Sequence, residues 1–346
     1  MRHIAISEDI DTTGRRLPFF LALEEWVARR LPAGNYFFSW QVNPTVICGR
    51  NQEIDKEVNL AYCRANGIDV VRRRSGGGCV FADRQNFMFS FITDSNDRVA
   101  EVFSRYTAMI ADALRKLGFD AIASGRNDIT IGEKKVSGNA FYHLPGRSIA
   151  HGTMLYDFDT ACLANALTPS KAKLESKGVK SVPMRVTCLK NEGITLTPVE
   201  FERFMIESIT DGEPYVLTAE DVAEVEKIEQ GYYDPAFMRI SANKTSETAK
   251  GKRHVSNNSI IKGLGEFCVE FDIDPAGSHI SNVSISGDFF MHGDVDEAIC
   301  RRLEGAECTA DALMHILQGI KVSEIIPGLT PEALSRMFIQ NKSSRR

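Results

Sequence analysis

The most informative stretch of the chain reads Arg72-Arg73-Arg74-Ser75-Gly76-Gly77-Gly78-Cys79-Val80-Phe81. Apolar β-forming residues stand on both sides of it, from Ile68 to Val71 and from Phe87 to Phe91. Consecutive glycines let a backbone approach a ligand and point several N–H groups at it, and arginines add fork-shaped donors for carboxylate or phosphate. The stretch therefore predicts an anion-binding loop; a flexible turn beside a basic surface patch is the alternative.

Two common phosphate-binding motifs do not fit this glycine loop, residues 75–78. A P-loop would continue with Gly-Lys-Ser or Gly-Lys-Thr, and neither follows here. A Rossmann turn would lead into a helix, whereas the residues after the glycines, Val80 and Phe81, favour a strand.

Length and composition limit the classes of protein. A chain of 346 residues suits two domains, and 43% hydrophobic with 25% charged residues is ordinary for a globular protein. The net charge of −5 argues against general nucleic-acid binding, and no apolar run approaches the ~20 residues of a membrane span. The N-terminal residues do not resemble a signal or transit peptide. The eight cysteines show neither Cys-x-x-Cys pairs nor Cys/His ligand spacing, so we expect no disulfide framework, no zinc site and a cytoplasmic location.

Hydrophobic periodicity and capping signals predict the elements of the first 240 residues. We expect helices at about 18–30, 97–117, 198–210 and from 218 to just before Gly231, with Gly118 ending the second and a capping box at Thr197 opening the third. The expected β elements are a strand at 3–7, a strand pair ending at 47–50, a hairpin over 68–92 with the glycine loop at its entry, and segments at 129–131, 135–143 and 149–156.

A polar, apolar-poor run at 241–252 predicts a linker. Beyond it, alternation predicts strands over 267–273 and 280–285, and three helices follow near 294–304, 309–319 and 330–340. The chain is thus expected to hold a catalytic domain at 1–245, a linker at about 241–254, and a small two-strand, three-helix domain at 255–346.

Four short motifs occur in order: Arg-Ser-Gly-Gly-Gly at 74–78, Gly-Arg-Asn-Asp at 125–128, Lys-Val-Ser-Gly at 135–138 and His-Gly-Thr at 151–153. Together with the segment 177–187, their order and spacing resemble the catalytic domain of lipoate–protein ligases, and the resemblance runs from Pro18 to near the C-terminus. It implies an α/β (α+β) fold similar to biotin and lipoate ligases, with a mixed, mostly antiparallel sheet and flanking helices, plus a small α+β accessory domain.

The resemblance also implies an activity. Lipoate and ATP would give lipoyl-AMP and pyrophosphate, and the lipoyl group would pass to a lysine of a lipoyl domain. The implied acceptors are 2-oxoacid dehydrogenase E2 subunits and the glycine-cleavage H protein, with no nucleic-acid or membrane partner. ATP is then a substrate, with Mg²⁺ as its metal.

Adenylation brings a carboxylate toward a phosphate, and a fixed cation lowers the barrier to that approach. By residue type alone, a solvated turn lysine is the favoured interpretation of Lys135. The resemblance implies that it is the catalytic lysine, contacting both the lipoate carboxyl and the phosphate. Lys134 is expected to be a surface charge only.

The remaining site residues follow from the same resemblance. For ATP and the adenylate they are Arg73, Gly76, Gly77, Gly78, Cys79, Val80, Phe81, Lys135 and Asn127. For lipoate they are Lys135, Arg73, Ser75, Gly78, His151 and Gly152. His151 could be a catalytic base, but we expect it to be a buried, hydrogen-bonded histidine in a turn. Asp128 is the expected Mg²⁺ contact, since hard cations prefer carboxylate oxygens; a capped turn is its alternative. The segment 168–185 corresponds to a loop that folds over the adenylate in the family.

Three rival functions stay open at this point. An octanoyltransferase or lipoyl amidotransferase of the same superfamily would use a cysteine in the turn at 125–128, and no cysteine stands there. A non-catalytic lipoyl-domain binder would not need Lys135, Arg73 and the glycine loop, and a biotin ligase is the weaker third. Two departures from the family, Ala82 for a histidine and Phe20 for an asparagine, bear on the preference for the acyl chain.

Overall fold

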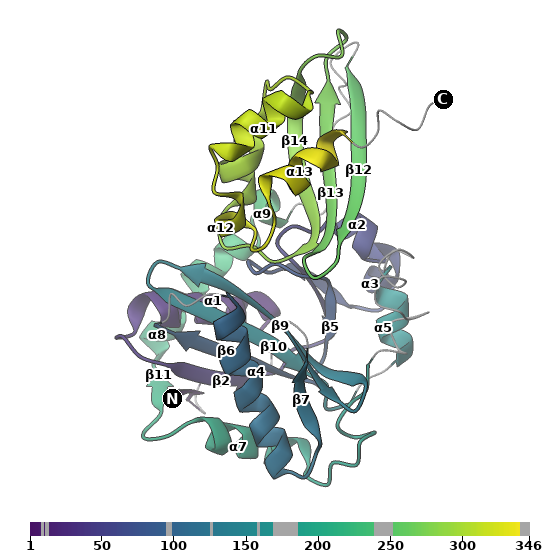
Figure 1. The fold of residues 1–346 in the computed structure, drawn as a ribbon. Coiled ribbons are helices and arrows are strands. Elements are labelled where there is room, and N and C mark those ends of the chain that lie inside the picture. The colour runs from purple at the N-terminus through teal and green to yellow at the C-terminus, as the bar shows by residue number, and fades with distance from the viewer. Residues whose placement is uncertain are drawn as a thin grey trace. The chain divides into compact units, whose positions relative to one another are not determined.

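A mixed sheet of eight strands organises the N-terminal part of the protein (Figure 1). The computed structural model describes residues 1–7, 10, 14–94, 99–124, 127–157, 160–168, 186–238 and 252–339. The strand order is β11-β1-β2-β6-β10-β9-β8-β7. Their bounds are β1 Arg2–Ile6, β2 Tyr36–Trp40, β6 Phe87–Thr93, β7 Ala121–Ser124, β8 Asp128–Ile131, β9 Lys134–Leu144, β10 Arg147–Met154 and β11 Tyr215–Leu217. Only β11, β1 and β2 pair in parallel; the other pairs are antiparallel, as the expected fold class requires.

A second, smaller sheet has the order β4-β3-β5, with β3 at Thr45–Cys48, β4 at Asp69–Arg72 and β5 at Val80–Ala82. The predicted hairpin over 68–92 is wrong, because β4 and β5 pair with the two edges of β3 and not with each other. The predicted pairing of the strands before residue 50 is also wrong, because β2 lies in the large sheet. Helices α2, Ile54–Glu57, and α3, Leu60–Ala65, form the crossover that makes β3 and β4 parallel.

Two long helices cover the opposite faces of the large sheet. Helix α1, Leu17–Arg30, is buried over almost its whole length, and its core includes Ile47, Val71 and Ala82 of the small sheet. Helix α4, Val99–Lys116, places Tyr106 against Phe91 of β6 and ends before Gly118, whose φ of 90° explains the stop.

The remaining helices of this unit are shorter. They are α5 Thr160–Ala166, α7 Pro198–Ile209, α8 Ala219–Glu229, the 3₁₀ turn η2 Gln230–Tyr232 and α9 Pro235–Met238. The predicted capping box at Thr197 is confirmed, and Thr218 caps α8 in the same way. No helix in the described part of the chain is long and apolar enough to cross a membrane.

The chain divides into two compact units, and the division does not follow the sequence. The first comprises Met1–Cys48, Asp55–Arg74 and Cys79–Met238. The second, called here the C-terminal unit, comprises Gly49–Ile54, Ser75–Gly78 and Arg239–Arg346. Two short segments from the N-terminal sequence, including the glycine loop, therefore belong to the C-terminal unit. The predicted domain limits at 245 and 255 stay predictions, and residues 241–251 of the expected linker lie outside the described residues.

The C-terminal unit holds an antiparallel sheet of β12 Arg253–Ile261, β13 Gly265–Ile273 and β14 Ile280–Phe289. One face of the sheet carries Phe267, Val269 and Phe271 into a core with the helices. The helices of this unit begin with the π-helical turn η3, Asp296–Cys300. They continue with α10 Arg301–Leu303, α11 Ala310–Gln318, α12 Val322–Ile325 and α13 Pro331–Ile339.

The two-strand prediction for this unit was wrong. Strand β12 was missed because its sequence is largely polar, with Val255 and Asn257 buried between exposed neighbours. Strand β12 begins at Arg253, so its first two residues lie within the range of about 241–254 that was predicted as a linker. The single turn of α12 was missed as well.

Backbone hydrogen bonds join the two N-terminal segments to β14 within the C-terminal unit. Gly77 N–H donates to the Phe289 carbonyl over 2.9 Å, and Gly287 N–H donates to the Asn51 carbonyl over 2.8 Å. A Cβ at Gly76 would lie 2.2 Å from the Phe289 oxygen, closer than real Cβ contacts allow. Glycine at position 76 is thus required by the close approach of two backbones.

Candidate active site

A β-bulge sets the direction of Lys135 on β9. Ile129 of β8 pairs with Ser137, but the next residue, Thr130, pairs with Lys135, so β9 carries one extra residue. Bulges re-aim side chains, because residues alternate between the faces of a strand. The extra residue turns Lys135 to the face that Gly138 shares, away from the face of Ser137.

Lys135 meets Asp128 across this hairpin. The Lys135 Nζ lies 2.7 Å from Asp128 Oδ1, and the two side chains are 19% and 14% exposed. The backbone of Lys135 is held on its other edge, since Thr187 N–H donates to the Lys135 carbonyl over 2.9 Å. Both main chain and side chain of this lysine are therefore fixed.

Gly138 supplies the space that the lysine occupies. A Cβ at position 138 would lie 2.4 Å from Lys135 Nζ and 2.6 Å from its Cε. Any larger residue at position 138 would have to displace the ammonium. The spacing of the Lys-Val-Ser-Gly motif thus has a steric reason in this hairpin.

Asn127 and Asn139 tie the preceding turn to β9. The Asn127 amide donates to the Asn139 carbonyl over 2.7 Å, and the Asn139 amide donates to the Asn127 carbonyl over 2.9 Å. A Cβ at Gly152, which pairs with Asn139, would lie 1.8 Å from Asn139 Oδ1. Gly152 therefore makes room for the asparagine that locks Asn127.

His151 lies in a buried polar network with Glu24 of α1. The His151 Nδ1 is 2.9 Å from Glu24 Oε2, and the Ser90 hydroxyl donates to Glu24 Oε1 over 2.5 Å. Trp40 Nε1 in turn donates to Ser90 Oγ over 2.8 Å, and the Phe20 ring stacks on Trp40 at 4.9 Å. The prediction that His151 is buried and hydrogen-bonded is confirmed; its expected place in a turn is wrong, because it lies within β10.

Strand register places these groups on one face of the sheet. Gly138 pairs with Thr153, Ala140 with His151, and His151 with Ser90. Side chains of directly paired residues point to the same face, and residues two apart on a strand do so too. Lys135 and the network around Glu24 therefore share the α1 face, at separate strands of the sheet.

The three arginines before the glycine loop have different partners. Arg73 is buried, and its Nη1 donates to the Ile47 carbonyl over 3.0 Å. Arg72 donates from Nε to the Met238 carbonyl over 3.0 Å. Arg74 reaches Glu25 of α1 over 2.5 Å.

Aromatic rings complete the setting of Arg74. Its guanidinium lies over the rings of Tyr232 and Phe237, each at 5.1 Å. The Tyr232 hydroxyl donates to Glu25 Oε1 over 2.6 Å, and burial, followed by the charge of Glu25, raises the pKa of Tyr232 well above its usual value. Arg74 therefore has a structural role, which the basic appearance of the stretch did not indicate.

The segment that follows the glycine loop belongs to the first unit. Cys79 precedes β5 and its thiol donates to Cys48 Sγ over 3.2 Å; this hydrogen bond and burial raise the pKa of Cys79 well above its usual value. Val80 and Phe81 lie in β5, with Phe81 buried. Ser75, Gly76, Gly77 and Gly78 belong to the C-terminal unit, where the Ser75 carbonyl accepts from Arg50 N–H over 2.9 Å.

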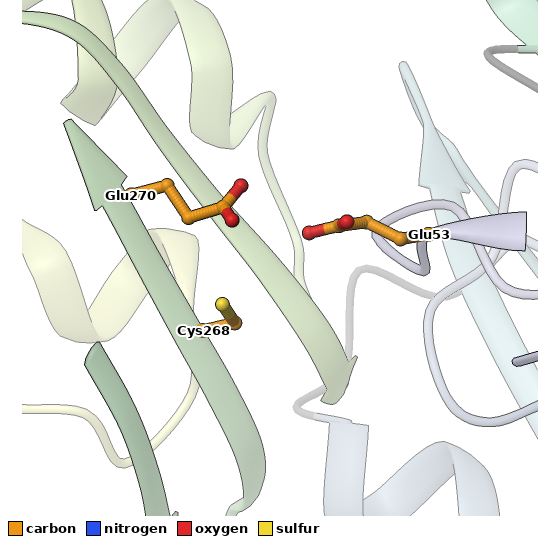
Figure 2. A group of neighbouring side chains, drawn as sticks. All are labelled: Glu53, Cys268 and Glu270. Atoms are coloured by element: carbon orange, nitrogen blue, oxygen red, sulfur yellow. The ribbon is translucent and has the colours of Figure 1, made fainter. Parts of the chain in front are cut away.

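Groups that could ligate a metal gather at one other place in the described residues. Figure 2 shows Cys268 and Glu270 on β13 with Glu53 facing them, and their ligand atoms lie within 4.8 Å of one another. Glu53 also accepts a hydrogen bond from Ser286 over 2.8 Å. All of these residues belong to the C-terminal unit.

The structure brings together Asn127, Asp128 and Lys135, and it places His151 on the same sheet face as Lys135. Sequence reasoning missed Glu24, Gly138 and Asn139 as parts of this arrangement. The signal for Glu24 was available, because Glu24 and Glu25 interrupt a helix whose other residues from Leu17 to Ala28 are apolar and buried. The segment 169–185, expected to close over the adenylate, lies outside the described residues.

Comparison with known proteins agrees with the four motifs. The family model described as the lipoyl protein ligase A/B catalytic domain matches residues 18–210. The chain belongs to the lipoate–protein ligase family. A second model, the bacterial lipoate protein ligase C-terminus, matches residues 264–338 of this ligase.

Curated relatives cover most of this lipoate–protein ligase. Lipoate–protein ligase 1 of Staphylococcus aureus is 37% identical over 284 residues, which is 80% of this chain and 83% of the relative. Lipoate-protein ligase LplJ of Bacillus subtilis is 32% identical over 320 residues, or 90% and 93% of the two chains. The function of this protein is accordingly that of a lipoate–protein ligase.

Solved structures share the fold of this ligase. Plasmodium falciparum LipL1, in complex with lipoate, has a TM-score of 0.71 at 20% identity and covers 92% of this chain and 94% of its own. A bipartite ligase from Thermoplasma acidophilum, studied with its E2 lipoyl domain, has a TM-score of 0.60 at 25% identity over 70% and 98% of the chains. A lipoate-protein ligase A bound with ATP has a TM-score of 0.59 at 23% identity over 69% and 99%.

Proposed function

We propose that this ligase works in two half-reactions, with lipoyl-AMP as the intermediate. In the first, the lipoate carboxylate attacks the α-phosphate of ATP and pyrophosphate leaves. In the second, a lysine amine of an acceptor protein attacks the acyl carbon and AMP leaves. The observation that carries this proposal is the partly buried ion pair of Lys135 and Asp128, on the sheet face that also holds the Glu24–His151 network.

Lys135 is the proposed catalytic residue. The lipoate carboxylate and the α-phosphate repel each other as they approach. A preorganised ammonium between them stabilises the transition state, in which both anions are close, more than it stabilises the binding of either anion alone. The bulge, the Thr187 hydrogen bond and Gly138 hold the lysine in place before any substrate arrives. Such fixing removes the need for reorganisation during the reaction.

The acyl chain of lipoate is proposed to lie along the α1 face, from Lys135 toward His151. This direction follows from the strand register that puts both residues on one face. Gly152, in contrast, acts through Asn139 and Asn127 on the other face. The stacked Phe20 and Trp40 rings next to Ser90 are proposed to affect which acyl chains are accepted.

The nucleotide is proposed to contact Arg73, the glycine loop, Asn127 and the segment from Cys79 to Phe81. Mg²⁺ would be held by Asp128 together with the phosphates, since this metal takes one or two carboxylates and keeps several waters. Such a metal offsets phosphate charge when it is bound. A single carboxylate fits that role, although Asp128 would then share its charge with Lys135.

The proposed acceptors are lysines of lipoyl domains in 2-oxoacid dehydrogenase E2 subunits and of the glycine-cleavage H protein. Family membership supports this choice, and the archaeal relative studied with an E2 lipoyl domain agrees with it. A reducing, cytoplasmic location is proposed as well, supported by the eight free cysteines.

The test is pyrophosphate exchange into ATP with lipoate, octanoate or biotin in parallel, followed by addition of an apo lipoyl domain. We expect exchange with lipoate, little with biotin, and a mass increase on one acceptor lysine. Acyl transfer from an acyl carrier protein in the absence of ATP would instead support the transferase alternative.

A further inference from the structure

Two thiols of the first unit touch each other at the start of the proposed adenylate segment. Cys48 is the last residue of β3, and Cys79 comes directly before β5. Their sulfur atoms are 3.2 Å apart. Both cysteines are free.

The strand register places the two cysteines directly opposite each other. Ile47 pairs with Val80 in the antiparallel β3–β5 ladder, so Cys48 and Cys79 form the next pair outward. Opposed residues of such a ladder have Cα atoms about 4.5–5.5 Å apart, within the range of about 4.4–6.8 Å that disulfides span. To form the bond, the sulfur atoms would have to approach from 3.2 Å to about 2.05 Å.

We propose that Cys48 and Cys79 are an oxidative modification site, at which a hydroperoxide forms an intramolecular disulfide that slows adenylation. Cys79 is half-buried and Cys48 is fully buried, so the peroxide reaches Cys79 first. The proposed effect on the rate rests on the proposed function of the segment from Cys79 to Phe81.

The chemistry balances in two steps. The Cys79 thiolate attacks the terminal peroxide oxygen, the O–O bond breaks, and an alcohol or water leaves with a sulfenic acid on Cys79. The Cys48 thiolate then attacks that sulfur, an S–S bond forms, and the S–O bond breaks to release water. Two thiols are oxidised and one hydroperoxide is reduced.

The surroundings make the oxidation slow at neutral pH. The thiolate is the reactive form, and the hydrogen bond to Cys48 together with burial raises the pKa of Cys79. The rate of disulfide formation is therefore expected to rise with pH.

The bond would act on elements that hold other proposed site residues. Arg73 N–H donates to the Cys48 carbonyl over 2.9 Å, and its side chain donates to the adjacent Ile47 carbonyl. In sequence, Cys48 precedes the segment Gly49–Ile54 and Cys79 follows Ser75–Gly78, the two segments of the C-terminal unit. A disulfide would tie the ends of both segments together.

The experiment uses the full-length protein, reduced and then freed of reductant by gel filtration. It is treated with tert-butyl hydroperoxide at neutral and at alkaline pH, alkylated, digested and mapped by mass spectrometry. We expect a Cys48–Cys79 cross-link that forms faster at the higher pH. Lipoate-dependent pyrophosphate exchange should fall by at least ~10-fold, because displacements of about 1 Å suffice for that. Reduction, followed by removal of the reductant, should restore it.

Two variants sharpen the result. Cys48→Ala should keep exchange activity before oxidation but form no cross-link, while Cys308→Ala, which removes a buried thiol of the C-terminal unit, should respond like the parent protein. The proposal is overturned if Cys79 links to Cys63, if both thiols stay free while half-buried Cys162 is oxidised, or if the cross-link leaves exchange unchanged. Should the reduced protein show no exchange at all, the proposed function fails, and the peptide map still tests the thiol pair.

Discussion

Lys135 and Asp128 form an ion pair of 2.7 Å across the β8–β9 hairpin, and both side chains are largely buried. Partly buried pairs of this kind are screened less by salt than surface pairs. The pair keeps the Lys135 ammonium at one position. Substitutions at Lys135 and at its neighbours therefore test the proposed function most directly.

Lys135→Ala should fold but fail to form the adenylate. Loss of a contact made mainly in the transition state is expected to cost at least ~3 kcal/mol, or about 100-fold in rate. Pyrophosphate exchange measures this, and thermal unfolding checks the fold. The matched control is Lys134→Ala, because Lys134 is the exposed neighbour on β9. Near-normal adenylation by Lys135→Ala would remove that lysine from its proposed role.

Gly138→Ala should lower activity without a comparable loss of stability. The added methyl group would lie 2.4 Å from Lys135 Nζ, so the ammonium must move while the strand stays intact. We expect adenylation to drop by ~10-fold or more. The control Gly118→Ala should behave in the opposite way, because Gly118 has a φ of 90° and open space around it. That variant should lose about 1 kcal/mol of unfolding free energy and keep its exchange rate.

Asp128→Asn separates two roles of this carboxylate. If Asp128 holds Mg²⁺ with the phosphates, the variant should need a several-fold higher Mg²⁺ concentration for half-maximal exchange. The velocity at saturating Mg²⁺ should also fall, because Lys135 loses its ionic partner. An unchanged Mg²⁺ dependence would contradict the metal role and leave only the positioning of Lys135.

His151→Ala should weaken lipoate binding and leave ATP binding unaffected. His151 holds the buried Glu24 carboxylate on the face proposed for the acyl chain. We expect the KM for lipoate to rise by about tenfold, equivalent to ~1.4 kcal/mol, with the KM for ATP unchanged. His143→Ala is the control, since His143 lies on the opposite face of β9 and hydrogen-bonds with Ser148. Equal effects on both substrates would point to a general loss of packing.

The oxidation of the thiol pair should follow pH in a defined direction. The pKa of Cys79 is raised in the folded protein, so its thiolate fraction at neutral pH is smaller than that of an ordinary cysteine. Alkylation of Cys79 by iodoacetamide should therefore be slow at pH 7 and should accelerate up to the raised pKa. A rate already at its plateau at pH 7 would contradict this direction.

Strong local signals predicted the longer helices well, whereas the short helices α2, α3, α5, α9 and α12 were not predicted. The capping box at Thr197 and the periodicity before Gly118 depend on neighbouring residues alone, and both are confirmed. The pairing of β3 was not predictable in this way, because it depends on which distant strands take its two edges. Strand β12 was not predicted for a related reason. Its residues are largely polar, and its place in the sheet depends on pairing with β13.

The site was only partly accessible from the sequence. The Lys-Val-Ser-Gly motif drew attention to Lys135 but did not reveal the bulge, which requires the register with β8. The contact between the Lys135 side chain and Gly138 depends on the direction in which that side chain points, and the spacing of residues in the sequence does not predict this direction. Likewise, nothing in the sequence indicated that Cys48 and Cys79, thirty-one positions apart, would touch.

The assignment of Gly49–Ile54 and Ser75–Gly78 to the C-terminal unit has a consequence for engineering and for evolution by recombination. An exchange of only the C-terminal part between relatives would bring in a β14 whose partners, Asn51 and Gly77, still come from the parent. Chimeras should therefore tolerate the exchange best when both upstream segments are transplanted with it. Substitutions in these two segments are expected to accompany substitutions in β14, because the backbones at Gly76 and Phe289 approach too closely for a side chain at position 76.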